Sequence, residues 1–139
     1  MFNVPEDRMN KKIVVVDDDK KILLVVEKAL NQLGYEVFSA EDGNKALESV
    51  KKNKPAVLLS DILIPGIDGV ALCGMIKNDP EFALTKVILM TGVYKNPTLR
   101  AELDSNADDF IEKPIDIEKL AGMITNQIVD YDLALTRNK

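Results

Sequence analysis

The chain has 139 residues, of which 46% are hydrophobic and 29% charged, and its formal net charge is -5. That length allows one domain with one core, and the acidic balance argues against direct nucleic-acid binding, which needs a clustered cationic face. The absence of histidine excludes Ser-His and Cys-His nucleophile pairs and histidine-ligated metal sites. No apolar stretch could span a bilayer, and no signal peptide pattern opens the chain, so we expect a folded cytoplasmic protein without membrane insertion.

Short apolar runs alternate with amphipathic segments along the chain. The predicted strands cover residues 13–16, 35–40, 56–60, 87–90 and 109–111. Apolar stripes at helical spacing cover residues 22–33, 46–50, 70–76 and 117–128, and a proline at position 97 opens a short helix to about Asp104. Asp68 and Asp116 are predicted helix caps, and Cys73, the single cysteine, is predicted to pack in the core.

This alternation predicts an α/β fold, a single doubly wound (βα)5 domain with a five-stranded parallel sheet. The first, third and fourth strands are continuously apolar, whereas the second and fifth are more polar or shorter, which favours edge positions and the flavodoxin-like order 2-1-3-4-5. We expect a flexible extension over residues 1–10, the folded domain over 11–131, and a helical extension or tail over 132–139.

Polar residues follow four of the predicted strands. Asp17 and Asp18 follow the first, Asp61 the third, Thr91 the fourth and Lys113 the fifth. The carboxyl ends of parallel strands meet at one edge of the sheet, where such folds place their chemistry. We therefore expect these five side chains to converge.

Clustered carboxylates repel one another unless a cation joins them. Mg2+ suits this cluster because it prefers oxygen ligands and is usually held by one or two carboxylates, water and a phosphate oxygen. We predict a metal site formed by Asp17, Asp18, Asp61 and the backbone carbonyl of Leu63. Lys113 and Thr91 would hold a phosphoryl group, and Asp61 is the best-placed nucleophile.

Four segments together resemble the response regulator receiver domain of two-component signalling, a CheY-like domain. They are Val14–Asp19, Leu58–Asp61 with Pro65–Gly69, Val87–Gly92 and Ala107–Pro114, and the resemblance runs from about Lys11 to Ile128. It implies that Asp61 accepts a phosphoryl group from a phosphohistidine on a histidine kinase or a histidine phosphotransfer protein. It also implies that Asp17 and Asp18 bind Mg2+ and that Thr91 and Lys113 contact the phosphoryl oxygens.

The resemblance further implies a switch. Phe110 is the aromatic switch residue, turning inward when Thr91 moves toward the phosphate. The signal passes to an effector protein through the surface of helix four, strand five and helix five, around Tyr94, Lys95, Phe110 and Ile111, and the phosphorylated form is a candidate homodimer. The chain then acts as a signalling domain rather than an enzyme, with no DNA-binding output domain of its own. The bond before Pro114 is commonly cis in this family.

Departures from the family pattern are few. Asn106 stands where the family often has glycine, and Asn tolerates a left-handed backbone. Leu63 and Val93, two residues beyond Asp61 and Thr91, are apolar and unsuited to orienting an attacking water. We therefore expect a long-lived phosphoryl state.

Two alternatives stay open at this stage. Asp17 to Asp19 also read as the D-x-D motif of haloacid-dehalogenase-like phosphatases, with Asp17 as the nucleophile, but Lys21 departs from that motif, no cap domain is present and Asp61 would be idle. A receiver-like domain that signals without phosphate is the other alternative, and the intact acidic cluster argues against it.

Overall fold

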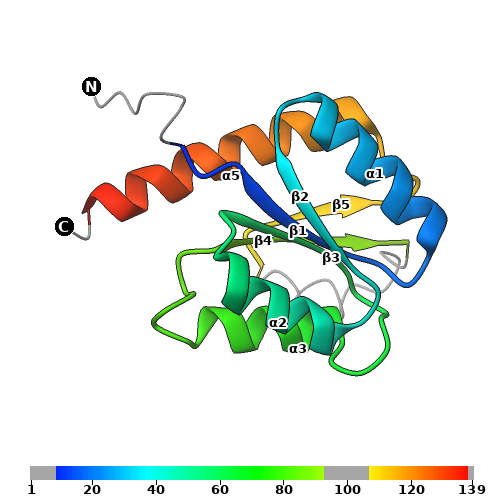
Figure 1. The fold of residues 1–139 in the computed structure, drawn as a ribbon, viewed down its shortest axis with the longest axis horizontal. Helices are drawn as coiled ribbons and strands as arrows, with labels where there is room; N and C mark the ends of the chain where they lie inside the picture. The colour runs from blue at the N-terminus through cyan, green and yellow to red at the C-terminus, as the bar shows by residue number, and fades with distance from the viewer. Residues whose placement is uncertain (1–8, 93–106, 138–139) are drawn as a thin grey trace.

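A computed structural model describes residues 9–92 and 107–137. Its strands are β1 (Lys12–Val16), β2 (Glu36–Ala40), β3 (Val57–Asp61), β4 (Lys86–Thr91) and β5 (Asp109–Glu112). Its helices are α1 (Lys20–Gln32), α2 (Gly43–Asn53), α3 (Gly69–Lys77) and α5 (Ile117–Arg137). All strand pairs are parallel, and the order β2-β1-β3-β4-β5 confirms the predicted fold (Figure 1). The predicted helix at 96–104 lies outside the described residues.

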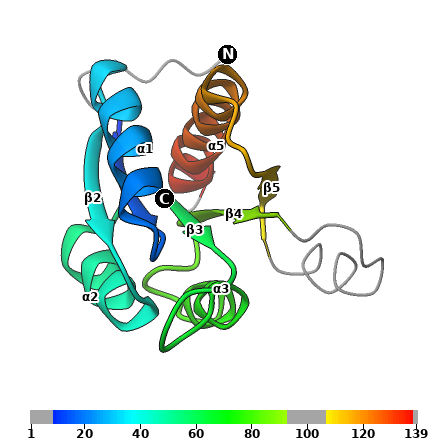
Figure 2. The same cartoon turned by 90° about the vertical axis from the view of Figure 1, so that its right-hand side faces the viewer.

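Among the described residues, α1 and α5 cover one face of the sheet, and α2 and α3 cover the other. Successive strand residues point to opposite faces, so Ile13 and Val15 pack toward α1 and α5, whereas Val14 and Val16 pack toward α2 and α3. Figure 2 shows these two layers on either side of the sheet. Because both faces are covered, the central strands must be continuously apolar, as the sequence predicted.

Aspartate side chains fix the starts of the helices. The carboxylates of Asp19, Asp42 and Asp68 accept hydrogen bonds from backbone N–H groups in the first turns of α1, α2 and α3. Asp116 does the same for Lys119 at 3.2 Å. These caps satisfy donors that a helix cannot pair internally. The predicted caps at Asp68 and Asp116 are confirmed.

Some details differ from the sequence-based expectations. Ile111, expected on the output surface, is only 2% exposed, because it packs into the core with α1 and α5. Helix α5 continues without a break past residue 131 to Arg137.

Cys73 is fully buried, as predicted. Among the described residues, no helix combines the length and apolar character needed to cross a membrane.

Candidate functional site

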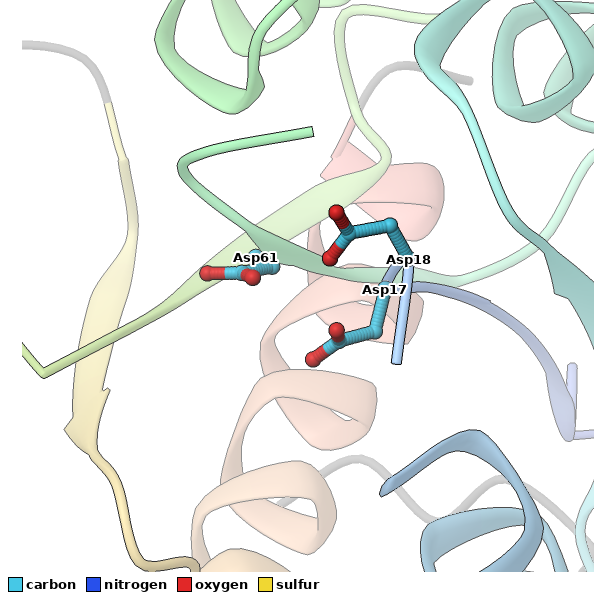
Figure 3. Close-up of side chains that lie close together, drawn as sticks. All are labelled: Asp17, Asp18 and Asp61. Carbon is cyan, nitrogen blue, oxygen red and sulfur yellow. The ribbon is translucent and has the colours of Figure 1, made fainter. Parts of the chain in front are cut away.

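Three carboxylates meet at the carboxyl edge of the sheet. Asp17 and Asp18 follow β1, and Asp61 is the last residue of β3. Parallel pairing sets Val16 opposite Ser60, so the aspartates that follow lie side by side. One oxygen from each carboxylate lies within 4.8 Å of the others. Figure 3 shows the three side chains close together.

Lys113 joins two of these carboxylates. Its Nζ lies 2.8 Å from Asp17 Oδ2 and 3.0 Å from Asp61 Oδ2. Its position is fixed by the sheet, because the backbone N–H of Lys113 donates to the carbonyl of Thr91, the last residue of β4, at 2.9 Å. Thr91 itself is only 3% exposed. The structure thus brings Lys113 to Asp17 and Asp61, with Asp18 beside them, whereas a role of the Thr91 side chain at this cluster stays a prediction.

Backbone donors orient the two carboxylates further. Asp17 Oδ1 accepts a hydrogen bond from the N–H of Asp19 at 2.9 Å, and Asp61 Oδ1 accepts one from the N–H of Ile62 at 2.8 Å. Each carboxylate thus has one oxygen held by backbone and the other by Lys113. No pattern in the sequence indicated that the backbone N–H of Asp19 would hold the Asp17 carboxylate.

Burial changes the pKa values of the charged groups at the site. Asp17 is fully buried, and that burial raises the pKa of its carboxyl group despite the hydrogen bond from Lys113. Burial alone would lower the pKa of Lys113, but hydrogen bonds to Asp17 and Asp61 outweigh it and raise the pKa. Three carboxylates facing one ammonium leave an excess of negative charge in the described part of the site. A further cation would relieve that excess.

The donor set fits Mg2+. Carboxylate oxygens are hard ligands, and the cluster is open on the side of Asp18, which is exposed, so water could complete an octahedron. The loop after β3 begins directly after Asp61, and Leu63 within it is 69% exposed. The assignment of the Leu63 carbonyl as a ligand stays a prediction.

The remaining predicted residues are Phe110, against the core, and four residues outside the described ranges. Phe110, in β5, is half-buried against the core on the α2 and α3 side. Val93, Tyr94, Lys95 and Asn106 fall outside the described residues. The Lys113-Pro114 peptide bond is cis.

An apolar groove beside the site was not anticipated. It has a volume of about 250 Å3 and runs between α1 and the residues after β5, lined by Lys21, Ile22, Val25, Val26, Lys113, Pro114 and Ile115. Val25, which lines the groove, is 58% exposed, and Leu24, which precedes it in the chain, is 61% exposed. Because both residues lie outside the apolar stripe of α1, the sequence could have indicated an exposed apolar surface on this helix.

The chain is similar in sequence to regulatory proteins. The model of a family described as the response regulator receiver domain matches residues 13–125. The transcriptional regulatory protein CrdR of Helicobacter pylori is 33% identical over 130 residues, which are 94% of this chain and 61% of that protein. The chain thus spans less than two thirds of that relative, and smaller fractions of others that it matches.

Solved structures agree with the sequence comparisons. A response regulator from Chloroflexus aurantiacus has a TM-score of 0.79 and 30% identity, with 86% of this chain and 98% of that one covered. The receiver domain of a sensor histidine kinase from Pseudomonas aeruginosa has a TM-score of 0.78 and covers 86% of this chain and 98% of its own. At 24% identity the second likeness concerns the fold, and that structure has a magnesium ion coordinated in its active site cleft.

Proposed function

The chain belongs to the response regulator receiver domain family of two-component signalling, and from that premise we propose that it is a switch controlled by phosphorylation of Asp61. The observation that carries the proposal is the bridge from Lys113 to both Asp17 and Asp61, with Asp18 beside them. Asp61 is 13% exposed at its side chain, whereas Asp17 is 0% exposed. Of the two carboxylates that Lys113 contacts, Asp61 is therefore the one that an incoming phosphoryl group can reach.

In the proposed reaction, a carboxylate oxygen of Asp61 attacks the phosphorus of a phosphohistidine on a histidine kinase or a histidine phosphotransfer protein. A P–O bond forms, the P–N bond breaks, and the imidazole leaves with the electron pair and takes up a proton. Lys113 then contacts the phosphoryl oxygens, since its ammonium already lies against Asp61. Transfer of this kind depends mainly on positioning and on neutralising charge.

We propose that Asp17, Asp18, Asp61 and the Leu63 carbonyl hold Mg2+. The metal would neutralise charge on the phosphoryl oxygens. Support comes from the excess of carboxylates over cations at the site and from the magnesium ion in the cleft of the Pseudomonas aeruginosa domain.

The output is proposed to follow from Thr91 and Phe110. Thr91 ends β4 next to Lys113, and Phe110 lies on β5, which pairs with β4. If Thr91 moves toward the phosphate, Phe110 can turn inward and change the surface of β5, α5 and the segment that precedes β5. A phosphoryl group shifts this equilibrium only through contacts that are better in one state. The effector protein and a phosphorylation-dependent homodimer belong to this proposal.

The groove beside α1 is the proposed docking place for the protein that carries the phosphohistidine. Lys113 lines the groove and also contacts Asp61, so a helix laid against Ile22 and Val25 would bring its histidine to the site. Exposed apolar side chains of this kind mark interaction surfaces.

The docking proposal has a direct test. Val25→Asp should slow transfer from a phosphorylated partner protein but leave labelling by a small phosphodonor unchanged. Leu33→Asp, at the far end of α1 and also exposed, is the matched control. An equal loss of transfer rate in both variants would rule out the groove as the docking place.

The chain is proposed to act in the cytoplasm as a signalling domain over residues 11–131. Its own catalysis would be limited to phosphoryl transfer onto Asp61 and slow loss of the phosphate. Leu63 and Val93 support the slow step, because neither side chain can orient a water. A phosphoryl half-life of seconds in the isolated protein with Mg2+ would contradict this part.

The central test is to incubate the protein with a small phosphodonor and Mg2+ and to find the labelled residue by mass spectrometry. We expect label on Asp61, none in Asp61→Asn, and no turnover of a phosphomonoester. Label on Asp17, abolished in Asp17→Asn, would favour the phosphatase alternative. The complete burial of Asp17 weighs against that alternative.

A further inference from the structure

The loop between β3 and α3, residues 62–68, is held between the first residues of two helices. The N–H of Gly69, which starts α3, donates to the carbonyl of Ile62 at 2.8 Å. The N–H of Gly43, which starts α2, donates to the carbonyl of Pro65 at 3.1 Å. Figure 1 shows this loop beside the start of α2. Both donors belong to the first turn of a helix, where N–H groups lack partners within the helix.

Gly43 allows an unusually close approach between α2 and the loop. A Cβ atom at this position would lie 1.9 Å from the carbonyl oxygen of Ile67 and 2.7 Å from its carbonyl carbon. These are backbone atoms, so no change of rotamer could relieve the contact. Any side chain at position 43 must therefore move the helix or the loop.

The loop has little freedom to absorb such a movement elsewhere. Ile62 and Ile64 are each 7% exposed and belong to the core between the sheet and α2 and α3. At the other end, a Cβ on Gly69 would lie 2.4 Å from the carbonyl oxygen of Asp61. Leu63, between the two anchored isoleucines, is the residue whose carbonyl is the proposed metal ligand.

We propose that Gly43 is a positioning residue for the metal site: by admitting the backbone of Ile67 against the start of α2, it fixes the loop that carries the Leu63 carbonyl. The inference rests on the proposed function, because it concerns the affinity of that site for Mg2+. Gly43 itself touches neither the carboxylates nor the metal. It acts through the loop, from a helix that supplies no residue to the carboxylate cluster.

The test is to measure Mg2+ binding by calorimetry for wild type, Gly43→Ala and Gly122→Ala. Gly122 lies in α5, and a Cβ atom added there would meet no neighbouring atom within 4 Å, so its substitution is the matched control. We expect Gly43→Ala to bind Mg2+ about tenfold more weakly, as when a residue that supports a metal ligand is lost. Labelling of Asp61 by a small phosphodonor should then need more Mg2+ but recover at saturating Mg2+.

Each outcome decides something. A lower melting temperature of Gly43→Ala with unchanged Mg2+ affinity would mean that Gly43 supports the fold alone, and would overturn the inference. If Gly43→Ala does not fold, Asn44→Ala replaces it, because the Asn44 side chain packs over Gly66 of the same loop; unchanged affinity there also overturns the inference. Failure of the wild type to bind Mg2+ would instead count against the proposed function.

Discussion

Asp17 and Asp132 lie near opposite ends of β1, and their side chains are 0% and 7% exposed. Burial raises the pKa of both carboxyl groups. Asp17 has Lys113 and a backbone N–H as partners, whereas Asp132, on α5, has the backbone N–H of Asn10 and one buried oxygen without a hydrogen bond. Burial alone therefore does not identify a site. A buried carboxylate becomes one when a cation and further carboxylates gather around it.

The largest expected effect comes from removing the cation. Lys113→Met leaves Asp17 buried and unpaired against Asp61, and should lower the free energy of unfolding by about 3 kcal/mol at neutral pH without Mg2+. Added Mg2+ should restore part of the loss, because it neutralises the same carboxylates. Urea denaturation with and without Mg2+ measures both effects.

Lys119→Met, which removes an exposed lysine from the first part of α5, is the control and should leave stability unchanged. Equal stability of Lys113→Met and wild type would mean that Asp17 needs no cation, and the contrast with Asp132 would then disappear.

Neutralising Asp17 should raise the stability of the fold but weaken Mg2+ binding. Because burial raises its pKa, the charged carboxylate disfavours the folded state, and Asp17→Asn should be more stable without Mg2+ by about 1 kcal/mol. It should also lose most of its Mg2+ affinity. Asp18→Asn, at an exposed position, should lose affinity without the gain in stability. Denaturation and Mg2+ titration of both variants check this, and a less stable Asp17→Asn would contradict it.

Neutralising Asp132 should give stability without any functional loss. Asp132→Asn is expected to raise the free energy of unfolding by about 1 kcal/mol at pH 7, since a charge no longer has to be buried. Its raised folded-state pKa means that the protonated carboxyl favours folding below the ordinary value of 3.8, and that this contribution is lost as the pH rises through the folded-state pKa.

The gap between Asp132→Asn and wild type should therefore narrow as the pH falls through the raised folded-state pKa of Asp132 and be closed below 3.8. Denaturation midpoints across this pH range measure it, and Asp130→Asn, exposed on the same helix, is the control. A gap that stays constant with pH would show that the titration of Asp132 is not its source.

The smallest effect is expected at Cys73. Burial raises the pKa of its thiol to about 11. At pH 8 about one molecule in a thousand then carries a thiolate, so a thiol reagent should label the native protein very slowly and the urea-unfolded protein at once. Rapid labelling of the native state would contradict this and mean that the core around Cys73 opens readily.

Much of the molecule could be predicted from its sequence, because the signals were local. Continuous apolar runs indicated the strand order, and the residues directly after them indicated the site, since parallel strands end at one edge. The misses depend on contacts between distant residues. Ile111 was expected on the surface, yet it packs in the core on the face of the sheet that α1 and α5 cover. The burial of Asp132 involves Asn10, and the need for glycine at position 43 involves Ile67.

The exposure of Leu63 has an evolutionary consequence. Its side chain points to solvent between two buried isoleucines, so its replacement removes little from the core, and surface substitutions usually change stability by less than about 0.5 kcal/mol. Selection could therefore vary this position with little effect on folding. If the side chain at 63 sets how quickly the phosphate is lost, the duration of the signal can diverge between related proteins while their architecture stays the same.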